Sequence, residues 1–178
     1  TENLDIIPAN IDLSAAEVQL VNEVARESAL ARVLRHVESD YDVVLIDCQP
    51  SLGLLAVNAL TAAHGVIVPV EAEFFALRGV ALLVETIETV RDRINPRLKI
   101  DGIVATMVDS RTLHSREVLQ RLQEAFGDLV FDTRIGRTIK FPDASVATEP
   151  IISYAPNHAG AHAYRRLARE VIARGDAA

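Results

Sequence analysis

The sequence predicts an α/β fold, a mostly parallel, doubly wound sheet with helices on both faces. Two observations predict it. Short apolar runs of strand length alternate with longer amphipathic segments from one end of the chain to the other. The apolar runs contain few polar residues, which is typical of strands that are buried on both faces. Strands joined through helices form right-handed crossovers and therefore a parallel sheet.

Apolar runs bounded by turn residues predict the strands. We expect Val43–Ile46, Gly65–Val70 and Ile100–Val108 to be neighbouring central strands, because each is a run of β-favouring residues. The other predicted strands are Leu4–Ile7, Val130–Ile135 and a short one at Ile151–Ile152.

Segments with apolar residues at helical spacing predict the helices between these strands. The longest of them, Leu77–Ile94, is amphipathic and stops at Asn95 and Pro96. Glycines end two others, at Gly127 and Gly175. The predicted helices are Ser14–His36 with an interruption near Glu27, Leu52–Ala63, Leu77–Ile94, Ser115–Phe126 and Asn157–Ala173.

The composition indicates one folded domain over residues 1–178, because 49% of the residues are hydrophobic and 24% are charged. No apolar stretch is long enough to form a spanning helix. The single cysteine, Cys48, excludes an internal disulfide framework and a Cys-rich zinc site. His158 and His162 have helical i, i+4 spacing without a third ligand nearby in the sequence, which favours a structural role over zinc binding.

Ligands of parallel α/β sheets bind beyond the carboxyl ends of the strands, so the residue after each strand is a candidate site residue. Asp47 directly follows Val43–Ile46, and four apolar residues that end in Asp form the Walker B pattern. A carboxylate in that place can hold the water shell of Mg²⁺. An Asp at a strand end is also common as a turn or helix cap, and the pattern alone leaves both interpretations open.

Several longer stretches occur in a family-like order and spacing over nearly the whole chain. They are Tyr41–Gly53 with Asn58–Leu60, Val68–Val70 with Glu73–Gly79, Thr106–Thr112, and Pro150–Ile151. Together they closely resemble the ParA-type partition ATPases, which belong to the MinD-like class of P-loop proteins. The resemblance implies a sheet of the P-loop NTPase type.

The chain departs from the family pattern at several positions. Gln49 replaces the first of two prolines, Ile135–Arg137 replaces Ile-Pro-Arg, and Phe141–Asp143 replaces Leu-Ser-Glu. The Gly-rich P-loop of the family, with its two lysines, and the catalytic Asp that follows an upstream strand have no counterpart in this sequence. We therefore expect an incomplete ATPase domain whose N-terminal part is missing, with no catalytic residue of its own and no ATPase activity alone.

The resemblance implies ATP and Mg²⁺ as cofactors of the complete protein. Asp47 would hold Mg²⁺ through water. Met107 and Asp109 would lie near the adenine, and the backbone of Ile135 and Gly136 would pass beside the adenine ring. Without the resemblance, Met107 is interpreted as a core residue.

The charge distribution leaves room for an anionic partner although the net charge is −7. Residues 1–110 carry eight Lys and Arg against seventeen Asp and Glu, whereas residues 111–174 carry ten against seven. The resemblance places DNA-binding basic residues at Arg111 and Lys140, with Arg137 as a third candidate. Arg116 and Arg134 could extend this patch. Such contacts would go to phosphates and would be nonspecific and salt-sensitive, whereas the alternative is an ordinary solvated surface.

The resemblance implies an ATP-dependent homodimer that binds nonspecific DNA and is driven by a ParB-like partner in chromosome or plasmid segregation. The expected location is the cytoplasm, at the nucleoid. Arg78 and Gly79 fit either a dimer face or a plain helix start. One alternative function is a truncated, non-catalytic module that binds partners. A MinD-like membrane switch is less favoured because no basic amphipathic extension follows the last helix, so we expect no membrane partner.

Overall fold

The computed structural model describes residues 3–73 and 76–176. These residues divide into two compact units, which are described separately. The first unit holds the residues up to His64 together with Thr89–Leu98, and the second holds Gly65–Glu88 and the residues from Lys99 onward. None of the helices in the described ranges is both long and apolar enough to cross a bilayer.

A parallel pair of strands forms the centre of the second unit. β1 (Gly65–Glu71) pairs in parallel with β2 (Lys99–Thr106), and Val68 lies opposite Ile103 in the register. Both of these residues are buried. The two strands match the predicted strands at these places, and their parallel pairing confirms the predicted α/β class.

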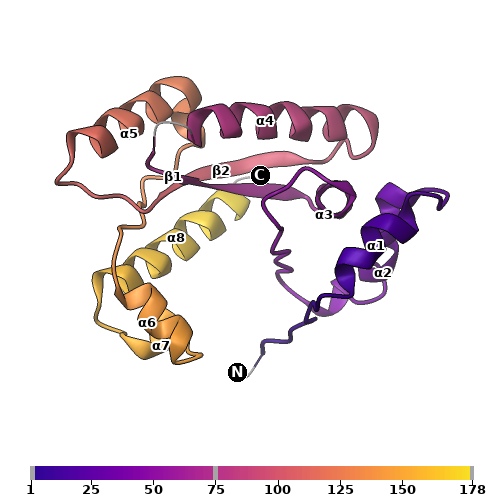
Figure 1. Ribbon diagram of the computed structural model, residues 1–178, viewed down its shortest axis with the longest axis horizontal. Coiled ribbons are helices and arrows are strands. Elements are labelled where there is room, and N and C mark those ends of the chain that lie inside the picture. The colour runs from indigo at the N-terminus through magenta and orange to yellow at the C-terminus, as the bar shows by residue number, and fades with distance from the viewer. Residues whose placement is uncertain (1–2, 74–75, 177–178) are drawn as a thin grey trace. The chain divides into compact units, whose positions relative to one another are not determined.

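Helices cover both faces of this sheet, as Figure 1 shows. The part of α4 (Ala76–Arg93) that belongs to the second unit lies on one face together with α5 (Leu113–Phe126). α8 (Ala159–Asp176) lies on the other face, and the short helices α6 (Lys140–Val146) and α7 (Ile151–Tyr154) lie near its beginning. This two-sided cover is the doubly wound arrangement that the alternating sequence predicted.

The segment predicted as the strand Val130–Ile135 runs beside β2 but forms only part of a ladder. It makes isolated parallel bridges to β2 and to the residues just beyond it instead of a continuous pairing. The bridges are Ile103 with Val130 and Val108 with Gly136, and the amides of Phe131 and Ile135 donate to the carbonyls of Ile103 and Ala105, each at 2.9 Å. The segment is therefore an extended chain held at the edge of β2.

Two side chains one turn apart on α8 fix this extended chain. The Glu170 carboxylate accepts hydrogen bonds from the amides of Asp132 at 2.7 Å and Thr133 at 3.1 Å. It also pairs with Arg174 at 3.7 Å. Partial burial raises the pKa of Glu170. The two amide hydrogen bonds and the charge of Arg174 lower it, and their combined effect is larger, so the net pKa shift is downward.

Arg174 also holds the extended chain, because its guanidinium stacks on the ring of Phe131. The guanidinium carbon lies 4.1 Å from the ring centroid. A Cβ on Gly102 would collide with that ring and lie 2.8 Å from Arg174 Nη1, so the close approach requires glycine. The guanidinium donates to the carbonyls of Asp101, Leu129 and Val130 at 3.1–3.2 Å. The core beneath contains buried Val104, Phe131, Ile135 and Ala163.

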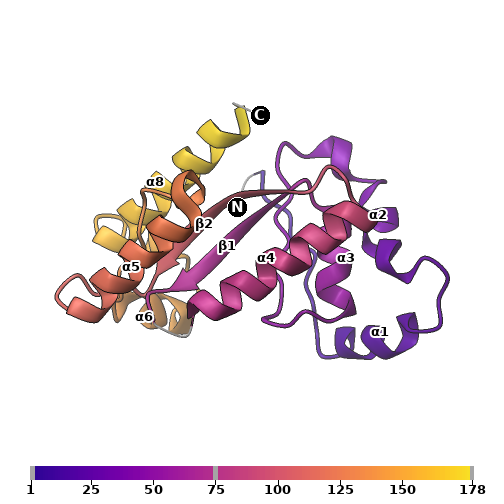
Figure 2. The same cartoon turned by 90° about the horizontal axis from the view of Figure 1, so that it is seen from above.

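The first unit is helical and is organised around α3 (Leu54–Ala62). α1 (Leu13–Leu20), α2 (Ala29–Leu34) and the 3-10 turn Arg26–Ser28 gather near α3, as Figure 2 shows. The separation of α1 from α2 confirms the predicted interruption near Glu27.

Buried asparagines join the parts of the first unit. Asn58 on α3 accepts from the amide of Leu30 at 3.1 Å and donates to the carbonyls of Arg26 and Leu54 at 2.9 Å. Asn95 donates to two carbonyls at the end of α3. Each side chain satisfies backbone groups that are distant in sequence, so it ties two segments together.

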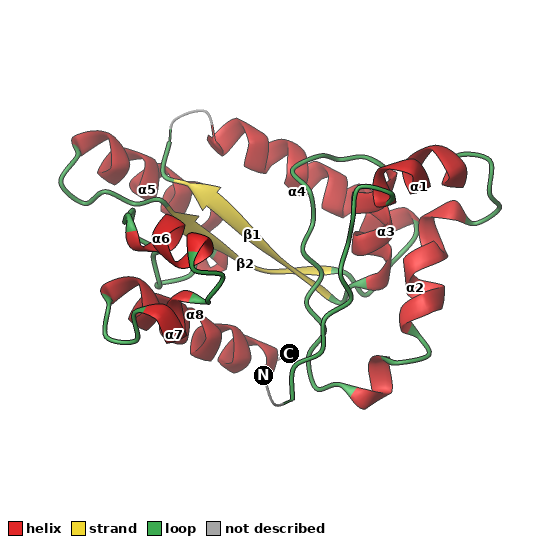
Figure 3. Ribbon diagram, turned by 60° about the horizontal axis from the view of Figure 1, so that its bottom comes forward, coloured by secondary structure: helices red, strands yellow, loops and turns green. Residues whose placement is uncertain are grey.

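The prediction that Val43–Ile46 forms a central strand is wrong for this structure, and so is the strand predicted at Leu4–Ile7. Figure 3 draws the chain before α3 as helix and loop. Val43 and Leu45 are 68% and 84% exposed. A strand needs a hydrogen-bonded neighbour, and within residues 3–73 and 76–176 no backbone ladder reaches either segment. The apolar run Val43–Ile46 indicated a buried strand, but a run of apolar residues does not show whether a neighbouring strand is present to pair with it.

The short strand predicted at Ile151–Ile152 is also wrong, because these residues begin α7. The carbonyl of Pro150 accepts from the amides of Ser153 and Tyr154, both at 2.9 Å. Pro150 is the N-cap residue of α7, and the carbonyl of an N-cap residue accepts the first hydrogen bond of its helix. Two isoleucines are too short a run to distinguish strand from helix.

We predict that Asn58→Ala lowers the free energy of unfolding by about 1–3 kcal/mol, because it leaves the part-buried amide of Leu30 and the carbonyl of Arg26 without their side-chain partner. Denaturant unfolding followed by circular dichroism measures the change. The matched control is Thr61→Val on the same helix, which removes one hydroxyl bond to the Val57 carbonyl and is expected to cost less. Equal stability of Asn58→Ala and wild type would contradict the prediction.

Candidate functional site

The carboxyl end of β2 carries the first of the predicted nucleotide residues. Met107 directly follows the strand and has a φ of 52°, a left-handed conformation that is uncommon for a residue with a side chain. Its side chain is not a core element, because the residue is 42% exposed. Strained backbone of this kind is held in place by its surroundings and occurs preferentially at functional sites.

The structure brings Met107 and Asp109 together with Ile135 and Gly136. The amide of Val108 donates to the Ile135 carbonyl at 3.1 Å, and the next strand-like bridge joins Val108 to Gly136. The Ile135 side chain is buried in the core, whereas Gly136 is exposed. The four predicted residues therefore form one edge at the end of the sheet, and we call Met107–Asp109 with Ile135 and Gly136 the sheet-end edge.

Asp109 in this edge holds Arg111 in a closely bonded pair. Its Oδ1 accepts from the Arg111 amide at 3.1 Å and from Nε at 2.9 Å, and its Oδ2 accepts from Nη2 at 2.7 Å. These side-chain and backbone hydrogen bonds from Arg111 lower the pKa of Asp109 to about 2. Thr112, the next residue, caps α5 by accepting from the Ser115 amide. The turn between β2 and α5 is thus ordered by its own side chains.

The other two predicted DNA-binding residues also have acidic partners. Arg137 Nη2 lies 3.5 Å from Glu73 Oε1, and Lys140 Nζ lies 3.1 Å from Asp143 Oδ2. Lys140 is also 5.9 Å from the ring centroid of Tyr154. Each of the three basic residues predicted to contact DNA is therefore paired with a carboxylate in this structure.

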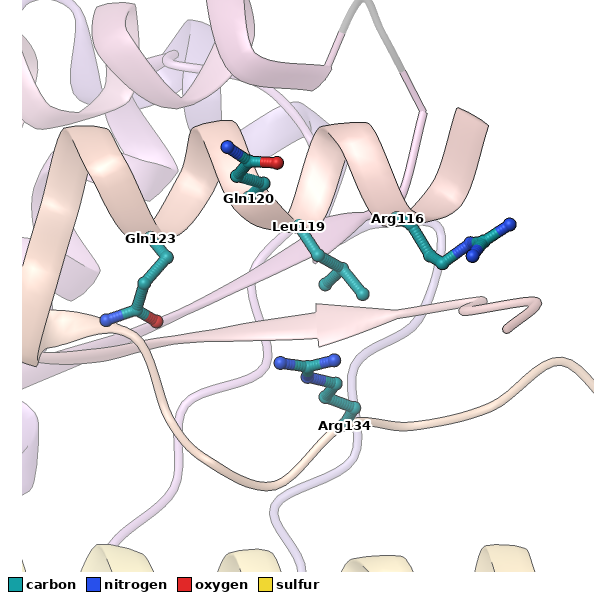
Figure 4. Close-up of a pocket in the computed structure, with 5 residues that line it drawn as sticks. All are labelled: Arg116, Leu119, Gln120, Gln123 and Arg134. Atoms are coloured by element: carbon teal, nitrogen blue, oxygen red, sulfur yellow. The ribbon is translucent and has the colours of Figure 1, made fainter. Parts of the chain in front are cut away.

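Arg116 and Arg134 differ from these three residues because they line a small open cavity instead of meeting a carboxylate. Arg116 comes from α5, and Arg134 comes from the extended chain beside β2, as Figure 4 shows. The cavity has a volume of about 300 Å³ and is also lined by Leu119, Gln120 and Gln123.

Asp47 belongs to the first unit and is exposed. One exposed carboxylate fits a magnesium ion that is held through water, because Mg²⁺ keeps several waters and takes further oxygen ligands from nucleotide phosphates. Within the described ranges, no three His, Cys, Asp or Glu side chains form a cluster that could hold a metal by themselves. Asp47 therefore fits a Mg²⁺–nucleotide pair and does not by itself form a metal site.

Sequence reasoning missed the side chains that order the sheet-end edge. Glu170 and Arg174 lie 37 to 73 residues from the groups that they bind, so no local pattern could reveal them. His158 Nδ1 accepts a hydrogen bond from the Gly160 amide at 3.0 Å at the start of α8.

Comparison with known proteins identifies the family of this chain. The family model described as an AAA domain matches residues 1–100. The chromosome-partitioning ATPase Soj of Treponema pallidum is 47% identical over 172 residues, which are 97% of this chain and 68% of the relative. The chain belongs to the ParA/Soj family.

An uncharacterised protein of Mycobacterium tuberculosis is 63% identical over 173 residues, which are 97% of this chain and 54% of that protein. The chain thus spans about half the length of this relative. The solved structure of cobyrinic acid a,c-diamide synthase from Mycobacterium smegmatis with a bound ATP analog and magnesium has a TM-score of 0.76 and is 44% identical. The match covers 89% of this chain and 59% of that one. These matches confirm the predicted resemblance and the ParA/MinD type of fold.

We predict that the pKa of Asp109 is about 2 and that Arg111→Ala raises it toward the ordinary value of 3.8. NMR titration of the side-chain carboxyl carbon measures both values. Arg116→Ala is the control, because it removes the same charge from a residue that makes no hydrogen bond to Asp109. A pKa of Asp109 near 3.8 in the wild-type protein would contradict the ion pair.

The same ion pair sets a pH dependence of stability. The pKa of Asp109 is lower in the folded protein than its ordinary value. The pair therefore stabilises the fold above pH 3.8, and this contribution is lost as the pH falls toward 2.

Proposed function

We propose that this protein acts as a ParA/Soj-type partition ATPase, in which an ATP-bound homodimer binds nonspecific DNA at the nucleoid and a ParB-like protein stimulates hydrolysis. The observation that carries the proposal is the sheet-end edge. Residues from two segments that the family uses at the nucleotide meet there, in a chain 47% identical to a chromosome-partitioning ATPase. Partition function, DNA and partner are proposed for the complete natural protein that contains this chain.

On the nucleotide side, the sheet-end edge offers backbone more than side chain to an adenine ring. A Cβ on Gly136 would meet only the Val108 carbonyl at 3.6 Å, an ordinary contact. Packing within the chain therefore does not require glycine there, and the lack of a side chain leaves room for a flat ligand. Met107 is exposed beside it and can cover the ring. Asp109 is held by Arg111, so the turn around the ligand is already ordered before binding.

On the phosphate side, the proposed roles are few. Bound Mg²⁺ would neutralise charge that develops on the phosphates during hydrolysis. Asp47 would hold a water of the ion's shell. The amide cradle and lysine of a P-loop are not among the residues of this sequence, so we propose that this chain by itself binds ATP weakly and does not hydrolyse it.

On the DNA side, Arg111, Arg137 and Lys140 would contact backbone phosphates. Their acidic partners reduce what each cation contributes, because the carboxylate competes with the phosphate for the same charge. These pairs are on the surface, where an ion pair contributes only about 0–1 kcal/mol, so a polyanion can displace the carboxylate. The expected DNA binding is therefore weak per residue and depends on salt.

We predict that Asp47→Asn lowers the ATP turnover of the complete natural protein at least about tenfold, a barrier increase of about 1.4 kcal/mol. The amide keeps the size of the side chain but loses the charge that orders the Mg²⁺ water. Steady-state phosphate release with saturating Mg²⁺ and ATP measures it. Asp42→Asn, an exposed acidic residue five positions earlier, is the control and is expected to keep wild-type turnover. Undiminished turnover in Asp47→Asn would show that Asp47 only caps a turn.

We predict that Arg111→Ala combined with Lys140→Ala weakens nonspecific DNA binding and leaves ATP binding unchanged. Each lost phosphate contact reduces the slope of log K against log salt by about 0.9, so a reduction of up to about 1.8 is expected. Fluorescence anisotropy with a labelled duplex over a salt series measures it. Binding that does not change with salt, in wild type or variant, would count against phosphate contacts altogether.

A further inference from the structure

The extended chain beside β2 carries a bulge just before the sheet-end edge. The amides of Phe131 and Ile135 donate to the carbonyls of Ile103 and Ala105, each at 2.9 Å. The two donors are four positions apart in the sequence, whereas the two acceptors are only two positions apart. The extended chain therefore holds two more residues than β2 over this stretch. Bulges occur preferentially beside active sites, where they change which residue comes next to the site.

One side chain of α8 binds the backbone amides inside the bulge. Asp132 and Thr133 lie within it, and their amides donate to the two carboxylate oxygens of Glu170 at 2.7 Å and 3.1 Å. In a regular parallel ladder the Thr133 amide would donate to the Ala105 carbonyl, which here accepts from Ile135 instead. Glu170 thus supplies the acceptor that the bulge takes from this part-buried amide, and an amide left unpaired there would be destabilising.

The chain is also held on both sides of the bulge. Before it, the Arg174 guanidinium donates to the carbonyls of Asp101 on β2 and Val130 on the extended chain, both at 3.1 Å. After it, the Ile135 carbonyl accepts from the Val108 amide at 3.1 Å. The bulge is therefore confined between two points that are fixed on the same sheet.

A slip of the extended chain by two residues would remove the bulge. Thr133 would then donate to Ala105 in place of Ile135. Arg134 would take the place that Gly136 now has opposite Val108. Because side chains alternate faces with a period of two, this slip would keep every side chain on its present face. The alternation of buried and exposed residues along the segment therefore does not distinguish the two registers.

Two other features select the register with the bulge. It places the Ile135 side chain in the core, and it leaves the Thr133 amide to Glu170, which would lose this partner after a slip. The choice of register matters for a ligand at the sheet-end edge. Gly136 leaves room there for a flat ring, whereas the slipped register would bring the long charged side chain of Arg134 to the same place.

We infer that Glu170 is a positioning residue for nucleotide binding, because its hold on the bulge keeps Gly136 opposite Val108. The inference rests on the proposed adenine contact at the sheet-end edge and deepens it by naming a residue of α8 that acts on this contact through the backbone. The proposed phosphate side of the site, with Mg²⁺ and Asp47, uses none of these residues. Loss of Glu170 therefore weakens the contact with the base and spares the contacts with the phosphates.

The test separates base binding from phosphate binding in the complete natural protein. Glu170→Gln keeps the size of the side chain but replaces one carboxylate oxygen with an NH₂ group, which cannot accept from an amide. Glu124→Gln is the matched control, because it makes the same change on an exposed residue of α5 that accepts from the Gln120 side chain. Dissociation constants are measured for ATP and for tripolyphosphate, which has no base, each with Mg²⁺. Thermal unfolding confirms that the variants remain folded.

We expect Glu170→Gln to weaken ATP binding at least about tenfold and tripolyphosphate binding less than about twofold, while the control stays within about twofold for both ligands. Hydrogen exchange without nucleotide should become faster at the amides of Asp132 and Thr133. If Glu170→Gln does not remain folded, Glu170→Asp, which shortens the side chain by one methylene, has the same expected result. Equal weakening of both ligands, or unchanged ATP binding, would overturn the positioning role while the proposed function stands.

Gly136→Ala distinguishes a failure of this inference from a failure of the proposed adenine contact. A Cβ at this position lies 3.6 Å from the Val108 carbonyl, so the chain accommodates it, whereas the added methyl group takes space from a bound base. We expect ATP binding to weaken at least about threefold and tripolyphosphate binding to stay unchanged. Wild-type ATP binding in this variant, or wild-type protein that binds tripolyphosphate as tightly as ATP, would overturn the adenine contact and the inference together.

Discussion

Glu170 and Arg174, one turn apart on α8, hold five consecutive residues of backbone against β2. The carboxylate binds the amides of Asp132 and Thr133, and the guanidinium binds the carbonyls before them and stacks on Phe131. These five residues form one isolated bridge to β2, between Val130 and Ile103, so a full ladder does not fix their position. The two charged side chains replace the missing ladder, and their own ion pair keeps both charges compensated while they are partly buried.

The position of the sheet-end edge follows from this attachment. Once residues 129–133 are fixed, the chain continues to Ile135, whose side chain enters the core, and to Gly136 beside Val108. The turn after β2 is ordered from the other side by Asp109, Arg111 and the Thr112 cap of α5. The positive φ of Met107 is tolerated because the segments before and after it are both held. Arg134 follows the fixed residues directly, so the attachment to α8 positions both the proposed nucleotide contact and the cavity that Arg134 lines with α5.

Charge pairing separates Arg111, Arg137 and Lys140 from Arg116 and Arg134. The family resemblance predicts DNA contacts at Arg111 and Lys140, and the structure gives each of these residues a carboxylate partner two or three positions away in the sequence. The resemblance does not itself assign DNA contacts to Arg116 and Arg134. Both residues line one cavity that has no acidic lining residue. Local sequence could have shown the Lys140–Asp143 spacing, whereas the cavity that Arg116 and Arg134 both line depends on how the chain folds. Such a distribution lets an acidic protein keep a local surface for anions.

The sequence by itself determined the α/β class, the two parallel strands β1 and β2, most helices and the family, because apolar periodicity and ordered motifs are local properties of the chain. The resemblance assigned Met107, Asp109, Ile135 and Gly136 to one nucleotide site, and the structure brings the two segments that carry them together. Only the tertiary structure decided which apolar runs become strands. Val43–Ile46 has the same local signal as Gly65–Val70, but only the second has a hydrogen-bonded neighbour in the described chain. The attachment of Glu170 and Arg174 to the chain beside β2 and the cavity between α5 and that chain were decided there too, because both join residues that are far apart in the sequence and no local pattern reveals such contacts.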